Sequence, residues 1–118
     1  NKYIEFDALQ EAGKIINLHQ SETVVLMKMG KFIKNGKVSK VENLKYTADF
    51  SFYALALKYN EHVIIGKNVI VEVKSIATAK KTDYAMRRKM FLNTLKKDDV
   101  FLEIVVGKGI KTTLWEVK

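Results

Sequence analysis

The chain has 118 residues, 47% hydrophobic and 29% charged, which is the composition of one folded domain with a real core. The absence of cysteine excludes disulfides and thiolate metal sites, and no apolar run is long enough to cross a membrane. A formal net charge of +8 suits a polyanionic partner, and composition alone does not separate nucleic acid from an acidic membrane or a merely basic surface.

The periodicity of residues 3–12 predicts an amphipathic helix that ends at Gly13, where a left-handed residue is favoured. A first strand is expected at Thr23–Lys28, followed by a solvated, lysine-rich connection that turns at Asn35-Gly36. Capping at Thr82 and helical spacing predict the clearest helix, at 82–95. Further strands are expected at 44–57, 63–65, 69–74, 100–106 and 110–117. The order predicts a single α+β or α/β domain over 1–118.

The strand at 69–74 carries an acid and a base next to each other on one face. Period-two geometry sends Val69, Val71 and Val73 to one side and Glu72 and Lys74 to the other. Burying such a pair costs free energy unless a metal, a partner or an open cleft compensates. The alternative is an exposed charge pair on a half-solvated sheet, which is common.

Asp49 lies in an earlier strand pattern, on the side opposite Phe50 and Phe52. If that strand neighbours residues 69–74, Asp49 and Glu72 converge on one divalent cation, with a backbone carbonyl, that of Val73, as a further ligand. Oxygen ligands favour Mg²⁺, for which Mn²⁺ can substitute. Lys74 would then orient the attacking water and stabilise charge on a phosphate, as metal-assisted phosphodiester hydrolysis requires.

Asp49 followed by Glu72-Val73-Lys74 resembles the motif of the PD-(D/E)XK nuclease superfamily, without the proline before the aspartate. Other segments resemble a family of small phage and prophage nuclease-like proteins in the same order: Leu9–Gln20, Tyr46–Phe50, Val71–Lys74, Thr82–Tyr84 and Arg88–Phe91. The resemblance implies a restriction-endonuclease-like αβββαβ core, with a central mixed sheet flanked by helices. It implies a Mg²⁺-dependent DNA endonuclease of the bacterial cytoplasm, acting on duplex or branched phage DNA.

The family carries an acid on its first helix, a few residues before the tyrosine that matches Tyr3. That position falls at or just before Asn1, so the first helix is expected to be truncated, or Glu5 or Glu11 substitutes, or activity is reduced. Gln20 is a further accessory candidate, to position a water or hold Lys74. A homodimer would supply the two sites that cutting both strands requires.

The superfamily helix beside the active strand corresponds here to a basic stretch expected to contact DNA phosphates. It comprises Lys80, Lys81, Arg87, Arg88, Lys89, Lys96 and Lys97. None of these residues suggests reading of base edges, so recognition of backbone or shape is expected. Any one of these cations can instead be a solvated surface residue.

Two other functions fit the same residues. One is a non-catalytic nucleic-acid-binding protein on the same fold, and the other is a basic structural or adaptor protein whose acid–lysine motif is accidental. His19 and His62 show no metal-ligand spacing and are expected to be loop or surface residues rather than general bases.

Overall fold

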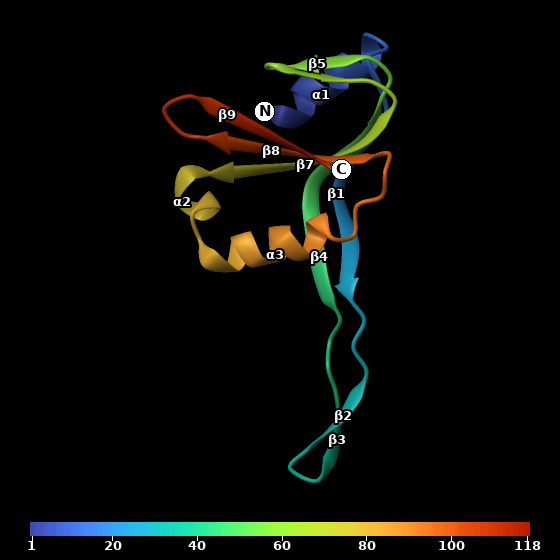
Figure 1. Cartoon of the computed structure of the whole chain (residues 1–118), viewed down its shortest axis with the longest axis vertical. Coiled ribbons are helices and arrows are strands. Elements are labelled where there is room, and N and C mark those ends of the chain that lie inside the picture. The colour runs from blue at the N-terminus through green and yellow to red at the C-terminus, as the bar shows by residue number, and fades with distance from the viewer.

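The structure, a computed structural model, describes all 118 residues and is drawn in Figure 1. Its helices are α1 (Lys2–Glu11), α2 (Ile76–Ala79) and α3 (Thr82–Leu92). Its strands are β1 (Ile15–Met27), β2 (Lys31–Lys34), β3 (Lys37–Lys40), β4 (Leu44–Ala54), β5 (Leu57–Tyr59), β6 (His62–Ile64), β7 (Lys67–Ser75), β8 (Asp99–Val106) and β9 (Ile110–Glu116). No helix is long and apolar enough to cross a membrane.

Five strands form the central sheet in the order β1-β4-β7-β8-β9. Only β7 and β8 run parallel, because the chain crosses between them through α2 and α3. The other neighbouring pairs are antiparallel. With the β2–β3 and β5–β6 hairpins and the one-turn helix α2 set aside, the elements from α1 to β8 follow the order αβββαβ. The predicted α/β class, with a mixed central sheet flanked by helices, is confirmed.

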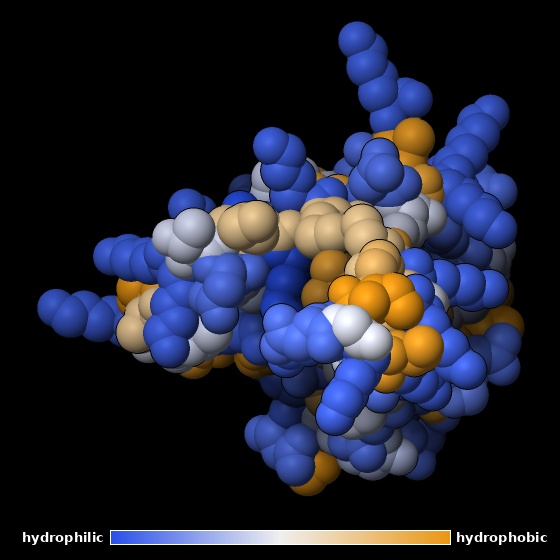
Figure 2. Space-filling model, turned by 90° about the horizontal axis from the view of Figure 1, so that it is seen from below, coloured by the Kyte–Doolittle hydropathy of each residue, from blue (hydrophilic) through white to orange (hydrophobic).

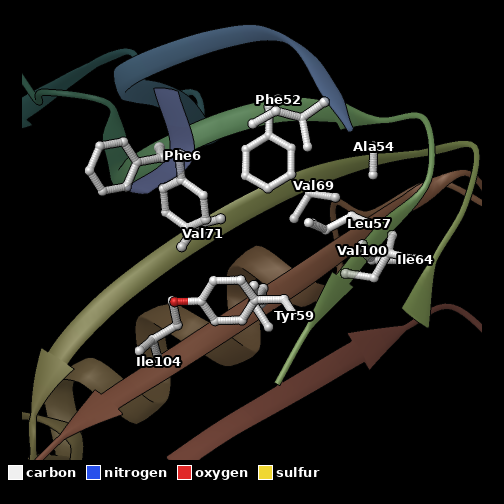
Figure 3. Packing of buried hydrophobic residues seen from close by; sticks show 13 residues of the cluster. Phe6, Phe52, Ala54, Leu57, Tyr59, Ile64, Val69, Val71, Val100 and Ile104 are labelled. Atoms are coloured by element: carbon white, nitrogen blue, oxygen red, sulfur yellow. The ribbon is translucent and has the colours of Figure 1, made fainter. Parts of the chain in front are cut away.

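The two long helices cover opposite faces of this sheet. Phe6 of α1 enters a cluster of 13 buried residues, where its ring lies 5.2 Å from that of Phe50 and 5.3 Å from that of Phe52 (Figure 3). Phe91 of α3 enters a smaller cluster on the other face, stacked on Tyr46 at 4.8 Å. Phe6 and Phe91 therefore anchor the two helices by packing among aromatic side chains of the sheet.

At Asp49, the buried side chains of strand β4 switch from one face of the sheet to the other. Tyr46 and Ala48 belong to the cluster under α3, whereas Phe50 and Phe52 belong to the cluster under α1, although all four have the same parity. On the facing strand β1, Ser21 has φ 56°, a left-handed conformation that interrupts strand alternation. The pairing of β4 with β7 also begins only at Phe50, so the strands separate at this point.

The β2–β3 hairpin forms an arm that projects from the body beyond the β1–β4 pair (Figure 1). We define the arm as residues 28–43. The long axis of the molecule is 58 Å, against 30 and 29 Å for the other two. A tight turn closes the arm, with φ 51° at Asn35 and 77° at Gly36, which is the left-handed pair that a two-residue hairpin turn needs. The expected turn is thus confirmed, with two short strands around it that were not predicted.

Several predicted boundaries were wrong. The first strand starts at Ile15 rather than Thr23, and passes through a register shift between Ile16 and His19. The run at 44–57 divides into β4 and β5, and the helix at 82 ends at Leu92. Thr82 is not the cap: Lys81 holds that position without a side-chain hydrogen bond, so the helix start depends on packing of Tyr84 and Phe91 instead.

Candidate metal and nucleic-acid site

Glu72 lies on β7 and faces α3, and only 1% of its surface is exposed. One carboxylate oxygen, Oε1, lies 2.6 Å from the Nζ atom of Lys74, two residues along the same strand. The other, Oε2, is buried and has no hydrogen-bond partner, and the same holds for the Tyr46 hydroxyl. The prediction that Glu72 and Lys74 share one face of the strand is confirmed, and the pair is not the exposed charge pair of the alternative interpretation.

Asp49 occupies the point where β4 and β7 separate. Its Oδ2 atom accepts a hydrogen bond of 2.7 Å from the backbone N–H of Val73, replacing the ladder bond that a continued β4 would have made. In a strand, the N–H and C=O of one residue point to the same side, so the Val73 carbonyl also faces the side of Asp49. The structure thus brings Asp49, Glu72, Lys74 and the Val73 backbone together.

The environment of Glu72 disfavours its ionised form. Burial raises the pKa of Glu72, and the negative charge of Asp49 raises it further, while the hydrogen bond from Lys74 and the weaker influence of the nearby Tyr46 hydroxyl lower it without overcoming them. Burial also raises the pKa of Tyr46, so its hydroxyl stays protonated and available as a donor. A buried carboxylate with one unbonded oxygen is a position that a cation or a proton would stabilise.

Glu103 on β8 is the direct register partner of Glu72 and is nearly as buried, with 4% exposed. Its carboxylate accepts hydrogen bonds from the Tyr84 hydroxyl, from Arg88 at 2.9 Å and from Trp115 at 3.3 Å. Burial opposes ionisation here too, but these three bonds outweigh it and lower the pKa of Glu103. Glu103 is therefore a satisfied structural acid, and its neighbour Glu72 is not.

A pocket of about 380 Å³ opens above Glu72 and Lys74, between β4, β7 and α3. Cations surround it: Lys81 and Arg87, both predicted to contact DNA, and Lys45, which was not predicted. The guanidinium of Arg87 also donates to the Lys45 carbonyl at 3.3 Å, which joins α3 to the base of the arm. The remaining wall consists of Tyr46, Thr47, Thr78, Asp83 and Tyr84. Asp49, which is half-buried, does not line this pocket.

The other predicted DNA contacts lie elsewhere. Arg88 is paired with Glu103 and stacks over the rings of Tyr84 and Trp115, so it is a packing residue. Lys80 lines a separate pocket with Lys108 and Lys111. Lys89 is an exposed residue of α3, and Lys96 and Lys97 are exposed beyond its C-terminal end. The structure thus brings only two of the seven predicted cations, Lys81 and Arg87, to the wall of the pocket with Glu72.

The accessory candidates do not join the two acids. Glu5 pairs with Lys2 at 3.1 Å and lines a pocket with Tyr59, and Glu11 is exposed at the end of α1. Gln20 is an exposed β1 residue opposite Phe50. No group of three or more His, Asp or Glu side chains is placed to hold a metal ion. Asp83 lines the pocket wall, but no third acid joins Asp49 and Glu72 in a group that could hold a metal ion.

The histidines lie away from the pocket. His62, within β6, contacts the Thr112 hydroxyl at 3.0 Å, and His19 is an exposed residue of β1. Lys45 and Tyr46 were missed because residues of a strand leading to an acid carry no distinguishing pattern. Lys45 had no signal beyond its proximity to Asp49, whereas Tyr46 opens the segment Tyr46–Phe50 that resembles the nuclease-like family.

Comparison with known proteins gives one match. Residues 1–113 match the family described as Protein of unknown function (DUF1064). No curated protein sequence matches the chain. No solved structure matches it either. The chain therefore belongs to the DUF1064 family.

Proposed function

We propose that this protein is a Mg²⁺-dependent endodeoxyribonuclease with a PD-(D/E)XK-like site, in which Asp49, Glu72 and the Val73 carbonyl hold the metal. The observation that supports this most is the Oε2 atom of Glu72, a buried carboxylate oxygen without a partner, beside a second acid whose charge it feels. Mg²⁺ commonly binds to one or two carboxylates and completes its coordination with water and substrate phosphate. Two acids and a carbonyl are thus a sufficient donor set.

When bound, Mg²⁺ would supply charge stabilisation at the scissile phosphate and lower the pKa of a coordinated water. The residues of the chain then have separate tasks. The Lys74 ammonium, held 2.6 Å from Glu72, orients the water and stabilises negative charge on the phosphate. Lys45, Lys81 and Arg87 line the pocket and bind flanking phosphates.

The second candidate, a DNA-binding protein without catalytic activity, is favoured by a different observation. Two carboxylates without a third metal-ligating side chain are a minimal set, and Lys74 already neutralises one oxygen of Glu72. On this interpretation the Lys74–Glu72 pair replaces the metal, and the basic pocket binds phosphate without cutting.

The test incubates the protein with supercoiled, linear and four-way-junction DNA in Mg²⁺ or Mn²⁺. We expect cleavage by the native protein and a loss of roughly 100-fold or more in Lys74→Met, as for removal of one group that stabilises a transition state. Lys58→Met is the matched control, because Lys58 is an exposed strand lysine that lines a different pocket. The Lys58→Met variant should cleave DNA at the native rate.

Metal binding is measured separately by thermal unfolding, since a ligand that binds only the folded state raises the melting temperature. Ca²⁺ or Mg²⁺ should stabilise the native protein and leave Glu72→Gln unchanged. DNA binding with neither cleavage nor metal-dependent stabilisation would establish the second candidate, and absence of DNA binding at low salt would reject both.

A further inference from the structure

The arm carries an unusual concentration of positive charge. The arm contains Lys28, Lys31, Lys34, Lys37 and Lys40, and its one acid, Glu42, lies at its base. All five are exposed, and Figure 2, which views the molecule from the side of the arm, shows hydrophobic patches set among long hydrophilic side chains. The turn at Asn35-Gly36 and the register of four residue pairs fix where these lysines lie.

That register places like charges directly opposite each other. Lys31 faces Lys40, and Lys34 faces Lys37. Directly opposite side chains in an antiparallel pair point to the same face, and like charges there are destabilising. A free hairpin gains nothing from two such pairs, whereas a hairpin that lies against a polyanion is stabilised by them. The pairing therefore points to a negatively charged partner of repeating charge.

The two faces of the arm are alike in chemistry. One presents Lys31 and Lys40 beside Ile33 and Val38, and the other presents Lys34 and Lys37 beside Phe32 and Ser39. Ile33 and Val38 are 70% and 67% exposed, so these apolar side chains are not held in a core. An element that is cationic on both faces suits a groove with phosphates along both walls better than it suits a flat surface.

We propose that the arm is a β-ribbon that enters a groove of duplex DNA and holds it against the basic pocket. The major groove admits a two-stranded β-ribbon, with the lysines of each face reaching the nearer phosphate wall. A second copy of the chain is the disfavoured occupant, because two such arms repel each other.

The arm also leads directly to the pocket, with Glu42 as the one acid between Lys40 and Lys45. Lys45 lines the pocket and lies on β4, eight residues from Lys37 near the tip. At about 3.3 Å per residue this is roughly 26 Å. At about 3.4 Å per base pair, the arm would follow roughly eight base pairs beyond the pocket.

The inference rests on the proposed function only in taking DNA as the polyanion, and its test needs no cleavage. Binding is measured in EDTA with a 24-base-pair duplex and a 24-nucleotide single strand, at 50 and 200 mM salt. Lys34→Gln/Lys37→Gln removes the tip pair, and Lys14→Gln/Lys58→Gln is the control, with the same loss of charge on exposed residues outside the arm.

Each lost phosphate contact lowers the salt slope by about 0.9, so the tip variant should lose about 1.8. Its fall in duplex affinity between 50 and 200 mM salt should then be about tenfold smaller than that of the native protein. The control should match the native protein, and single-strand affinity should change little. Because the Lys34→Gln/Lys37→Gln substitution removes a like-charged pair, the melting temperature of this variant should not fall below that of the native protein. If it does, Lys31→Gln/Lys40→Gln repeats the test one pair away from the turn.

An unchanged salt slope in both lysine variants would overturn the proposal and leave the proposed nuclease untouched. Equal losses for duplex and single strand would exclude a groove. A change in oligomeric state on sedimentation would assign the arm to self-association instead. Normal arm behaviour in a protein that never cuts DNA would retain the arm and reject the nuclease.

Discussion

The two buried glutamates of the central sheet should respond in opposite directions to the same substitution. Glu72 and Glu103 are register partners on β7 and β8, both nearly inaccessible. Glu103 accepts three hydrogen bonds, whereas Glu72 has Lys74 on one oxygen and nothing on the other. Glutamine keeps the shape of each side chain and removes its charge. The pair thus separates the effect of hydrogen-bond satisfaction from that of burial.

For Glu72→Gln in EDTA at pH 7, we expect the free energy of unfolding to rise by about 1 kcal/mol. The amide still leaves a polar atom at this position, so the gain comes from removing a buried charge, and the lost attraction to Lys74, whose side chain is 29% exposed, offsets part of it. For Glu103→Gln we expect a fall of about 2–4 kcal/mol, because the half-buried Arg88 guanidinium loses its charged partner.

The two effects should also have opposite pH dependence. The pKa of Glu72 is raised on folding, so its ionisation reduces stability as pH rises from the unfolded value of about 4.3 through the folded value. The gain in Glu72→Gln should therefore vanish below about pH 4. The pKa of Glu103 is lowered, so its contribution is present above about pH 4.3 and is lost as pH falls through the folded value.

The assay is urea unfolding followed by circular dichroism between pH 4 and pH 8, with unchanged slopes taken as evidence of two-state behaviour. A loss of stability in Glu72→Gln as large as that in Glu103→Gln would refute the reasoning. Glu72 would then be a structural partner of Lys74 rather than an acid whose ionised form is disfavoured in the absence of a cation.

Two further predictions concern elements that position the site. Asp49→Ala should lower the free energy of unfolding by about 1–2 kcal/mol, since the Val73 N–H loses its acceptor. Asp49→Asn keeps an acceptor and should stay near native stability, but it should lose metal binding in the thermal-shift assay. Equal stabilities of the two variants would show that the bond to Val73 is unimportant. Phe91→Ala should lower the free energy of unfolding, measured in urea, by about 3–5 kcal/mol, because Phe91 packs between Tyr46 and Phe101. The control, Met86→Ala on the exposed side of the same helix, should change it by less than about 0.5 kcal/mol. A Phe91→Ala loss no larger than that of the control would mean that α3 is not held by this side chain.

The local part of the site was predictable from sequence, because strand alternation alone puts Glu72 and Lys74 on one face. The same rule failed for β4. Tyr46 and Phe50 have one parity and pack on opposite faces, and nothing in the sequence marks the irregularity that Ser21 introduces on the neighbouring strand. A left-handed serine is a conformation set by tertiary contacts, so period-two reasoning cannot anticipate it.

The contrast between the two acids was equally hidden. Glu72 and Glu103 both interrupt apolar strands, and only tertiary structure supplies Tyr84, Arg88 and Trp115 to one of them. The arm was read as a turn because all but one of the residues of its strands are exposed, leaving no alternation to detect. Arg88 was assigned to DNA from its place in a basic run, although its side chain faces inward to Glu103.

The separation of β4 from β7 links the fold to the proposed chemistry. If β4 continued to pair with β7 beyond Phe50, a ladder bond would occupy the Val73 N–H, and the next β4 residues would cover Glu72. Because the strands part at Asp49, β4 instead runs on through Lys45 to the arm, and the space it leaves is the pocket above Glu72 and Lys74. This departure from strand geometry leaves Glu72 at the floor of the pocket and lets the Asp49 carboxylate accept a hydrogen bond from the Val73 N–H. The arm extends away from the sheet from the same region. The acids and the arm lie on either side of the same break in the sheet, so DNA bound along the arm, as we propose, would extend toward them.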